Sequence, residues 1–180
     1  KSIVEKLGAK STPSLYVCDI YFCVKTAIKV EDVEMDEVGS YSLRLRKSKK
    51  GGEKKHFTVN TKTIISHGDH NAWEEHEVEV NDFSEAAKIL NMTEFKPFFK
   101  LEKERFVYKL DNMEICIEDI MDFGGAVEIE IMCSTHEATE AKQKIKDFLR
   151  KCNINDTKIV PKSITNIIMK ERAFKQEISI

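Results

Sequence analysis

Apolar and charged residues alternate along several short segments of this chain, and residues 127–131 show the pattern most clearly. An alternation with a period of two residues is typical of a β-strand with one apolar face and one polar face. Glu128 and Glu130 therefore share one face of the predicted strand. The same reasoning places Arg44 and Arg46 on one face of another strand, and Glu77 and Glu79 on one face of a third.

The period-two pattern predicts seven strands, at residues 15–24, 41–47, 56–63, 74–80, 98–110, 113–119 and 126–132. A helical period predicts four helices, at residues 2–7, 82–92, 134–153 and 161–174. Asp82 or Ser84 is expected to cap the second helix, and Ser134 with Glu137 to form a capping box. The strands outnumber the helices and are joined by short turns, so the sheet is predicted to be antiparallel.

Two segments between these elements are predicted to be loops. Residues 25–39 are acidic and irregular, which indicates a solvated loop. Residues 64–73 carry His67 and His70. A metal site there would need further ligands, so a plain polar loop is the preferred interpretation.

The charged residues are segregated by sign from strand to strand. Basic side chains share strand faces at Arg44, Arg46, Lys62, Lys103 and Arg105, and acidic ones at Glu77, Glu79, Asp119, Glu128 and Glu130. One interpretation is an open sheet with one wet face. The other is a sheet curled until its charged face lines a tunnel, with the apolar residues turned outward to the helices. Segregation by sign favours the tunnel, because like charges at alternate positions repel each other unless a ligand of opposite charge lies between them.

Length and composition narrow the class of protein. A chain of 180 residues fits one domain with a core of ordinary size. The net charge of −2 offers no broad basic surface for nucleic acid and no polybasic patch for a membrane. We see no apolar run of transmembrane length and no signal peptide. The five cysteines are odd in number and lack a CxxC motif, which indicates free thiols in a reducing cytoplasm.

Several of these segments resemble the CYTH superfamily, named for class IV adenylyl cyclases and thiamine triphosphatases. The strand Cys18-Asp19-Ile20-Tyr21-Phe22 resembles Q-x-D-x-Y-F, and Leu43-Arg44-Leu45-Arg46 resembles L-R-I-R. Further along the chain, Asn60-Thr61-Lys62 stands for T-x-K, Glu75-His76-Glu77-Val78-Glu79 for R-x-E-x-E, and Lys103-Glu104-Arg105 with Tyr108 for K-x-R-x-x-Y. Finally, Asp119, Gly124-Gly125 and Glu128-Ile129-Glu130 resemble D-x-V-x-x-L-G-x-F-x-E-I-E.

The resemblance implies an α+β fold: an eight-stranded antiparallel β-barrel that forms a triphosphate tunnel, with helices packed outside. It covers roughly residues 1–152, within a single domain at 1–180. The E-x-E-x-K strand of the family is absent, and the chain opens at Lys1 in an amphipathic helix. We therefore expect that strand to lie upstream of this sequence. Asn60 replaces the usual threonine, and residues 25–39 and those after 155 have no clear counterpart.

The resemblance also implies roles for individual residues. The expected triphosphate ligands are Arg44, Arg46, Lys62, Lys103 and Arg105, because guanidinium and ammonium groups bind phosphate oxygens. The expected ligands for Mg²⁺ or Mn²⁺ are the carboxylates Glu128, Glu130, Asp119, Glu77 and Glu79. Glu77 and Glu79 can alternatively orient the basic residues, which we rank slightly higher. The expected catalytic residues are Asp119, Glu128 and Lys103.

The spacing is most similar to that of class IV adenylyl cyclases. The leading hypothesis is therefore a metal-dependent cyclase that converts ATP to cyclic AMP and pyrophosphate. One alternative is an inorganic or thiamine triphosphatase, in which water attacks the γ-phosphorus. Another is a non-catalytic module that binds polyphosphate or nucleotide. The expected partner is ATP or another triphosphate, with no nucleic acid and no membrane, and a homodimer is compatible with this interpretation.

Overall fold

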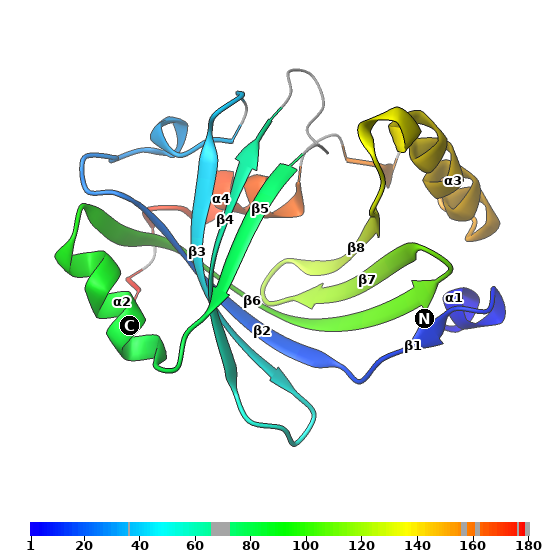
Figure 1. The fold of residues 1–180 in the computed structure, drawn as a ribbon, viewed down its shortest axis with the longest axis horizontal. Helices are drawn as coiled ribbons and strands as arrows, with labels where there is room; N and C mark the ends of the chain where they lie inside the picture. The colour runs from blue at the N-terminus through cyan, green and yellow to red at the C-terminus, as the bar shows by residue number, and fades with distance from the viewer. Residues whose placement is uncertain (36, 66–72, 156–157, 161–162, 176, 179–180) are drawn as a thin grey trace. The chain divides into compact units, whose positions relative to one another are not determined.

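The computed structural model describes residues 1–35, 37–65, 73–155, 158–160, 163–175 and 177–178 (Figure 1). The predicted loop with His67 and His70 lies outside the described residues, as do Pro161 and Lys162 at the predicted start of the last helix.

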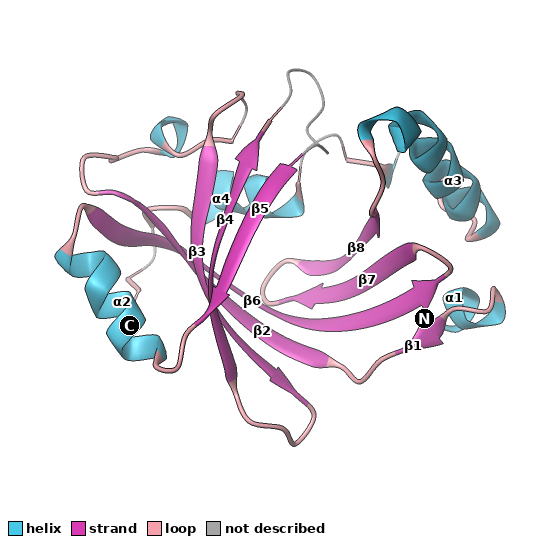
Figure 2. Ribbon diagram, in the orientation of Figure 1, coloured by secondary structure: helices cyan, strands magenta, loops and turns pink. Residues whose placement is uncertain are grey.

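All seven predicted strands are present (Figure 2). Their bounds are β2 Leu15–Val24, β3 Tyr41–Lys50, β4 His56–Ile64, β5 Trp73–Glu79, β6 Phe95–Leu110, β7 Met113–Ile120 and β8 Gly124–Ile131. An eighth strand, β1 at Lys10–Ser11, pairs with β6 and was not predicted, since two residues are too short to show an alternation.

The strand order is β5-β4-β3-β2-β6-β7-β8, with β1 beside β6. The ladders β1–β6, β3–β4, β4–β5 and β7–β8 are antiparallel. The predicted fold class, α+β with eight antiparallel strands and helices against the sheet, is confirmed. The chain divides into two compact units, and β6 contributes residues to both. Unit 1 comprises residues 1–15 and 104–160, and unit 2 comprises residues 16–103 and 161–180.

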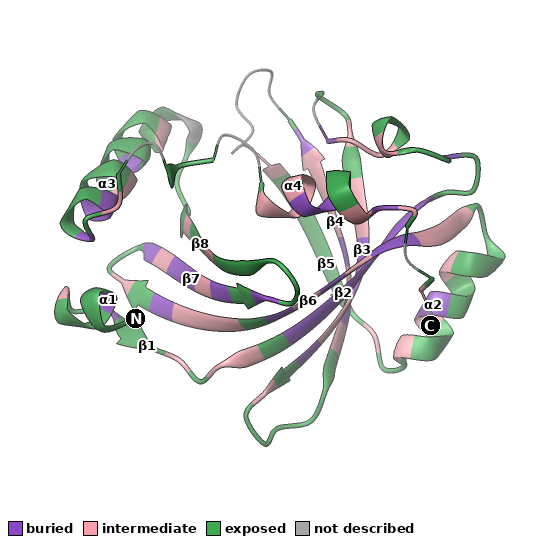
Figure 3. Ribbon diagram, turned by 180° about the vertical axis from the view of Figure 1, so that it is seen from behind, coloured by how far each residue is buried: buried purple, intermediate pink, exposed green. Residues whose placement is uncertain are grey.

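The core of unit 2 lies between helix α2, at Phe83–Met92, and the apolar face of β2 and β3. Ile20, Phe22 and Leu45 pack against Ala87, which is completely buried. The buried positions of β2 are visible in Figure 3. Asp82 caps α2 as predicted, because its carboxylate accepts a hydrogen bond of 3.0 Å from the backbone N–H of Glu85.

Helix α4, at Ile164–Arg172, also belongs to unit 2. Ser163 caps it by accepting a hydrogen bond of 3.2 Å from the N–H of Asn166. Just beyond the helix, the N–H of Phe174 donates to the carbonyl of Phe98 at 3.0 Å, and the two rings are in contact. These contacts fix the end of the chain against β6.

The core of unit 1 forms where α1, at Ser2–Lys6, and α3, at Ala138–Lys151, meet β7 and β8. Val4 and Phe148 pack with Ile115, and Ile129 lies against the same cluster. The last segment before α3 differs from the predicted helix. Residues Thr135–Glu137 form a 3₁₀ turn, and the carboxylate of Glu137 accepts from both the N–H and the hydroxyl of Ser134. Only the glutamate half of the predicted capping box is therefore present.

Four of the five cysteines are buried and Cys133 is exposed, and all five are free thiols. Among the described residues, we find no helix that is both long and apolar enough to cross a membrane.

Candidate functional site

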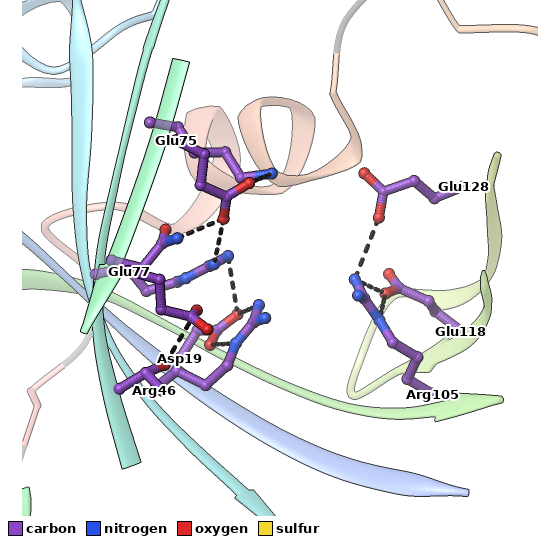
Figure 4. A network of polar contacts seen from close by, with 11 residues as sticks. Asp19, Arg46, Glu75, Glu77, Arg105, Glu118 and Glu128 are labelled. Atoms are coloured by element: carbon purple, nitrogen blue, oxygen red, sulfur yellow. Dashed lines mark hydrogen bonds and ion pairs between the residues drawn. The ribbon is translucent and has the colours of Figure 1, made fainter. Parts of the chain in front are cut away.

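The register of β3, β4 and β5 places several of the predicted phosphate ligands side by side in unit 2. Arg44 lies opposite Asn60, and Lys62 lies opposite Glu75. Directly opposed residues of an antiparallel pair point to the same face. We call this set the cation-rich face; its members are Asp19, Arg44, Arg46, Asn60, Lys62 and Glu75 (Figure 4).

Asp19, on β2, is the residue around which this face is organised. Its side chain is completely buried, and it binds the guanidinium of Arg46 through two hydrogen bonds. Nε of Arg46 donates to Oδ1 at 2.7 Å and Nη2 donates to Oδ2 at 2.9 Å. Nη1 of Arg44 lies 3.7 Å from Oδ2 of the same carboxylate. The anion between the two arginines is therefore, in this structure, a carboxylate of the protein.

The pKa values of this pair follow from its geometry. Burial alone would raise the pKa of Asp19, but the charge of Arg44 and the hydrogen bond and charge of Arg46 lower it from 3.8 to about 2. Lys103 is buried and its charge contributes to the same shift. Burial would lower the pKa of Arg46, but the hydrogen bonds that Arg46 donates to Asp19 and the charge of that carboxylate outweigh burial and raise the pKa. Both groups are therefore ionised at neutral pH.

Arg44 differs from Arg46 in how much of its hydrogen-bonding capacity is used. The residue is 8% exposed, yet its buried Nε has no hydrogen-bond partner in the described part of the chain. Its ion pairs with Asp19 and Glu75, at 3.7 and 3.8 Å, are longer than a hydrogen bond. The buried Oδ1 of the opposing Asn60 also lacks a partner. A buried, unsatisfied donor is uncommon and indicates a group prepared for a ligand.

Glu75 occupies the space between the remaining donors of the face. Its carboxylate pairs with Nζ of Lys62 at 2.9 Å, accepts a hydrogen bond from the amide of Asn60, and faces Arg44. Burial raises its pKa, but the hydrogen bond and charge of Lys62 outweigh burial and hold the pKa below the ordinary range. An anionic ligand of Lys62 and Arg44 would have to compete with this carboxylate.

Glu77 and Glu79 make weaker contacts on the same side of β5. Glu77 accepts a hydrogen bond of 3.2 Å from the hydroxyl of Thr58, and Glu79 lies 3.2 Å from Nε2 of His56 in an exposed position. These contacts fit an orienting role better than a shared metal site.

The corresponding charged surface of unit 1 lies on β7 and β8. Cys116 is opposite Glu128 and Glu114 is opposite Glu130, so these side chains share one face with Glu118. We call this set the acid-rich face; it comprises Glu114, Glu118, Glu128, Glu130 and Arg105. Arg105 donates from Nε to Glu118 at 2.6 Å and from Nη2 to Glu128 at 3.1 Å (Figure 4).

The structure does not bring Asp119 to the other predicted metal ligands. Asp119 pairs with Gly125, on the face opposite to Glu128 and Glu130, and it is exposed. Neighbouring residues of a strand point to opposite faces, so a shift of one position moves the carboxylate away. Glu118 is the buried carboxylate on the expected face. The pattern D-x-V-x-x-L-G-x-F-x-E-I-E agrees: when its first E-I-E glutamate is aligned with Glu128, its aspartate falls on Glu118.

Sequence reasoning therefore missed three members of the two faces. Asp19 was visible in the D-x-Y-F match but received no role. Glu75 stands where the family pattern has an arginine, and this departure from the pattern could have drawn attention to the residue. Glu118 was passed over for its neighbour. By contrast, Arg44, Arg46 and Lys62 share one face in the structure, and Glu128 lies beside Arg105.

The acid-rich face suits a divalent cation by the chemistry of its donors, which are hard carboxylate oxygens. Glu114 and Glu130 lie directly opposite each other, and like charges in that position are destabilising unless a cation lies near them. Within the described residues, however, no three potential metal ligands lie together. Two of the carboxylates are instead engaged by Arg105.

Fold and site together define an α+β protein in which each of the two units presents ionised residues on one face of its strands. Residues 19–164 match the CYTH domain, and the chain belongs to this family.

Individual proteins show the same similarity. A "Putative adenylate cyclase" of Methanocaldococcus jannaschii is 28% identical over 161 residues, which cover 89% of this chain and 85% of that protein. The solved structure of the PH1819 protein of Pyrococcus horikoshii aligns with a TM-score of 0.77 at 22% identity, covering 94% of this chain and 93% of that one. A structure from Vibrio parahaemolyticus, titled a putative adenylate cyclase, aligns with a TM-score of 0.73 at 12% identity, covering 93% and 88%. The two structural likenesses establish the fold.

Proposed function

We propose that this protein binds the triphosphate of a nucleotide and is a class IV-type adenylyl cyclase, which converts ATP to cyclic AMP and pyrophosphate. CYTH proteins bind triphosphate substrates. Two similar proteins, from Methanocaldococcus jannaschii and Vibrio parahaemolyticus, are named as putative adenylate cyclases, and these names support the cyclase. The proposal treats residues 1–180 as one CYTH domain.

The observation that carries the proposal is the state of Arg44. Its guanidinium is buried, ionised and aimed into a face that also carries Lys62, and its Nε has no hydrogen-bond partner among the described residues. A phosphate oxygen is the kind of acceptor that completes such a donor, with a charge-assisted hydrogen bond. Arg46, in contrast, already has two hydrogen bonds to Asp19 and serves to hold that carboxylate.

The reaction requires little chemistry from side chains. The ribose 3′-oxygen forms a bond to the α-phosphorus, the bond from that phosphorus to the β-phosphate oxygen breaks, and the hydroxyl proton passes to a base. Most of the rate enhancement in phosphoryl transfer comes from positioning and from stabilising charge. In this proposal Arg44, Lys62 and Lys103 bind phosphate oxygens and stabilise the leaving pyrophosphate. The roles that the resemblance gives to Arg105 and Glu128 remain part of the proposal.

We further propose that Mg²⁺ or Mn²⁺ binds on the acid-rich face. Glu128 and Glu130 are the proposed ligands, with Glu118 in place of Asp119, because Glu118 shares their face. A bound divalent cation would neutralise phosphate charge and lower the pKa of an attacking hydroxyl. The ion pairs of Arg105 with Glu118 and Glu128 would have to open to release these oxygens.

The test is product analysis with ATP, thiamine triphosphate and inorganic tripolyphosphate, each with Mg²⁺ and with Mn²⁺. We expect cyclic AMP and pyrophosphate from ATP. Orthophosphate with a nucleoside diphosphate would instead identify a triphosphatase. Binding without turnover of any of the three compounds would identify a non-catalytic module and refute the cyclase.

A further inference from the structure

A cavity of about 170 Å³ lies in unit 2, beside the C-terminal end of β2 and the N-terminal end of β3. Its walls come from β2, β3, the segment 32–40, β6 and α4. Four of its side chains are apolar or aromatic and almost fully buried, namely Tyr21, Met35, Phe98 and Met169. Ser40 and Ser42 add polar groups to the lining. Part of the lining is therefore buried core, and the rest is polar or exposed.

The cavity continues the cation-rich face along the strands. Alternate residues of a strand share a face, so Tyr21 lies on the same face as Asp19, and Ser42 on the same face as Arg44. Ser42 is directly opposite Lys62. A ligand bound by Arg44 and Lys62 can therefore extend along this face into the cavity.

The lining is unsuited to another phosphate group. Burying a charged group among apolar side chains is costly unless it is paired. The two carboxylates on the lining are already engaged: Asp32 accepts from the N–H groups of Ile28 and Lys29, and Glu34 pairs with Lys170 at 2.5 Å. Four of the buried side chains of the lining are aromatic rings or thioethers, and such groups favour flat, polarisable rings.

The volume of the cavity also fits an aromatic ring. An apolar cavity of roughly 150 Å³ is enough to hold a benzene ring. The cavity described here is of that order and is partly open, so a ring system can enter with its edge near Ser40 and Ser42. One of the lining side chains, Met169 on α4, lies beyond the residues that match the CYTH domain.

We propose that this cavity binds the heteroaromatic base of a nucleoside triphosphate whose phosphates lie on the cation-rich face. The inference rests on the proposed function and deepens it, because it assigns the base of the nucleotide to a particular cavity of this protein. Tyr21, Met35, Phe98 and Met169 are the residues that contact the ring.

The experiment compares metal-free binding of ATP and inorganic tripolyphosphate by calorimetry, in the wild type and two variants. Met169→Phe fills the cavity from α4, and Ser42→Val narrows it from β3. We expect the wild type to bind ATP at least roughly 10-fold more tightly than tripolyphosphate, which corresponds to about 1.4 kcal/mol. In both variants ATP affinity should fall towards that of tripolyphosphate, whose own affinity stays unchanged.

The outcomes separate this inference from the proposed function. If the wild type binds both compounds equally, or if the variants weaken both equally, the base site is wrong while triphosphate binding stands. If the wild type binds neither compound, both proposals fail. Should Met169→Phe unfold in a thermal melt, Ser42→Val and the wild-type comparison still decide the question.

Discussion

The cation-rich face of unit 2 and the acid-rich face of unit 1 balance their charges in opposite ways. On the first, a completely buried Asp19 is shared by two arginines, and basic groups exceed what that carboxylate can bind. On the second, a single guanidinium, that of Arg105, is bound by Glu118 and Glu128 while further carboxylates lie on the same strands. The first face is rich in basic donors, and the second is rich in carboxylates.

The comparison shows that runs of like charge along a strand are balanced by neighbouring strands. Arg44 and Arg46 repel each other along β3, and β2 supplies the anion that separates them. The kind of group that each face gathers is therefore informative: the Nε of Arg44, which has no hydrogen-bond partner among the described residues, fits a phosphate oxygen, and the directly opposed carboxylates Glu114 and Glu130 fit a cation. Five experiments can break or sharpen this comparison.

The largest effect is expected from Asp19→Asn. Removing the charge leaves two buried arginines without their shared anion, and breaking a buried ion pair typically costs about 3–5 kcal/mol. Urea unfolding should show a loss of this order in the free energy of unfolding. Glu128→Gln is the matched control, since that carboxylate is half-exposed and its loss should cost less than about 1 kcal/mol.

The pH dependence of the same variant gives an independent check. The pKa of Asp19 is lowered on folding, so its contribution is present above the unfolded value of 3.8 and is lost as the pH falls towards about 2. A shift of this size corresponds to about 2 kcal/mol. Wild-type stability should fall in this window more steeply than that of Asp19→Asn. Parallel profiles would contradict the assignment of Asp19 as the central anion.

The next largest effect is expected from Glu128→Gln on turnover. If Glu128 is a metal ligand, ATP turnover should fall by on the order of 100-fold while the melting temperature changes little. Asp119→Asn, on the opposite face of β7, should keep wild-type turnover and metal dependence. If Glu128→Gln retains its activity and its Mn²⁺ titration, the carboxylate serves only to pair with Arg105.

Arg44 and Arg46 are expected to separate binding from stability. Arg44→Ala should weaken tripolyphosphate binding by roughly 10- to 100-fold, because a charge-assisted hydrogen bond is lost. Arg46→Ala should chiefly lower the free energy of unfolding, because Asp19 loses its two hydrogen bonds. Calorimetric titrations and urea unfolding on both variants test this. Arg44→Ala with a large loss of stability and unchanged affinity would make Arg44 structural.

The smallest effect, and one of opposite sign, is expected from Glu75→Gln. The substitution removes an anion that competes for Lys62 and Arg44, so tripolyphosphate should bind a few-fold more tightly. Glu74→Gln is the control, because the neighbouring residue points to the other face and pairs with His76. A weaker affinity in Glu75→Gln would show that the carboxylate supports the ligand and does not compete with it.

The sequence alone determined seven of the eight strands, the four helices and, apart from Asp119, the charged side of the strands, because these depend on local periodicity. It determined the family for a related reason: short motifs such as Leu43-Arg44-Leu45-Arg46 keep their spacing within single strands. The strand register, which no local pattern contains, then decided which charges meet. Only the tertiary structure showed that Asp19 forms the ion pair with Arg46 and that Glu75 forms the ion pair with Lys62. It also showed that Glu118, and not Asp119, shares a face with Glu128. Ion pairs of this kind join residues far apart in the chain, and a shift of one residue reverses the face to which a side chain points.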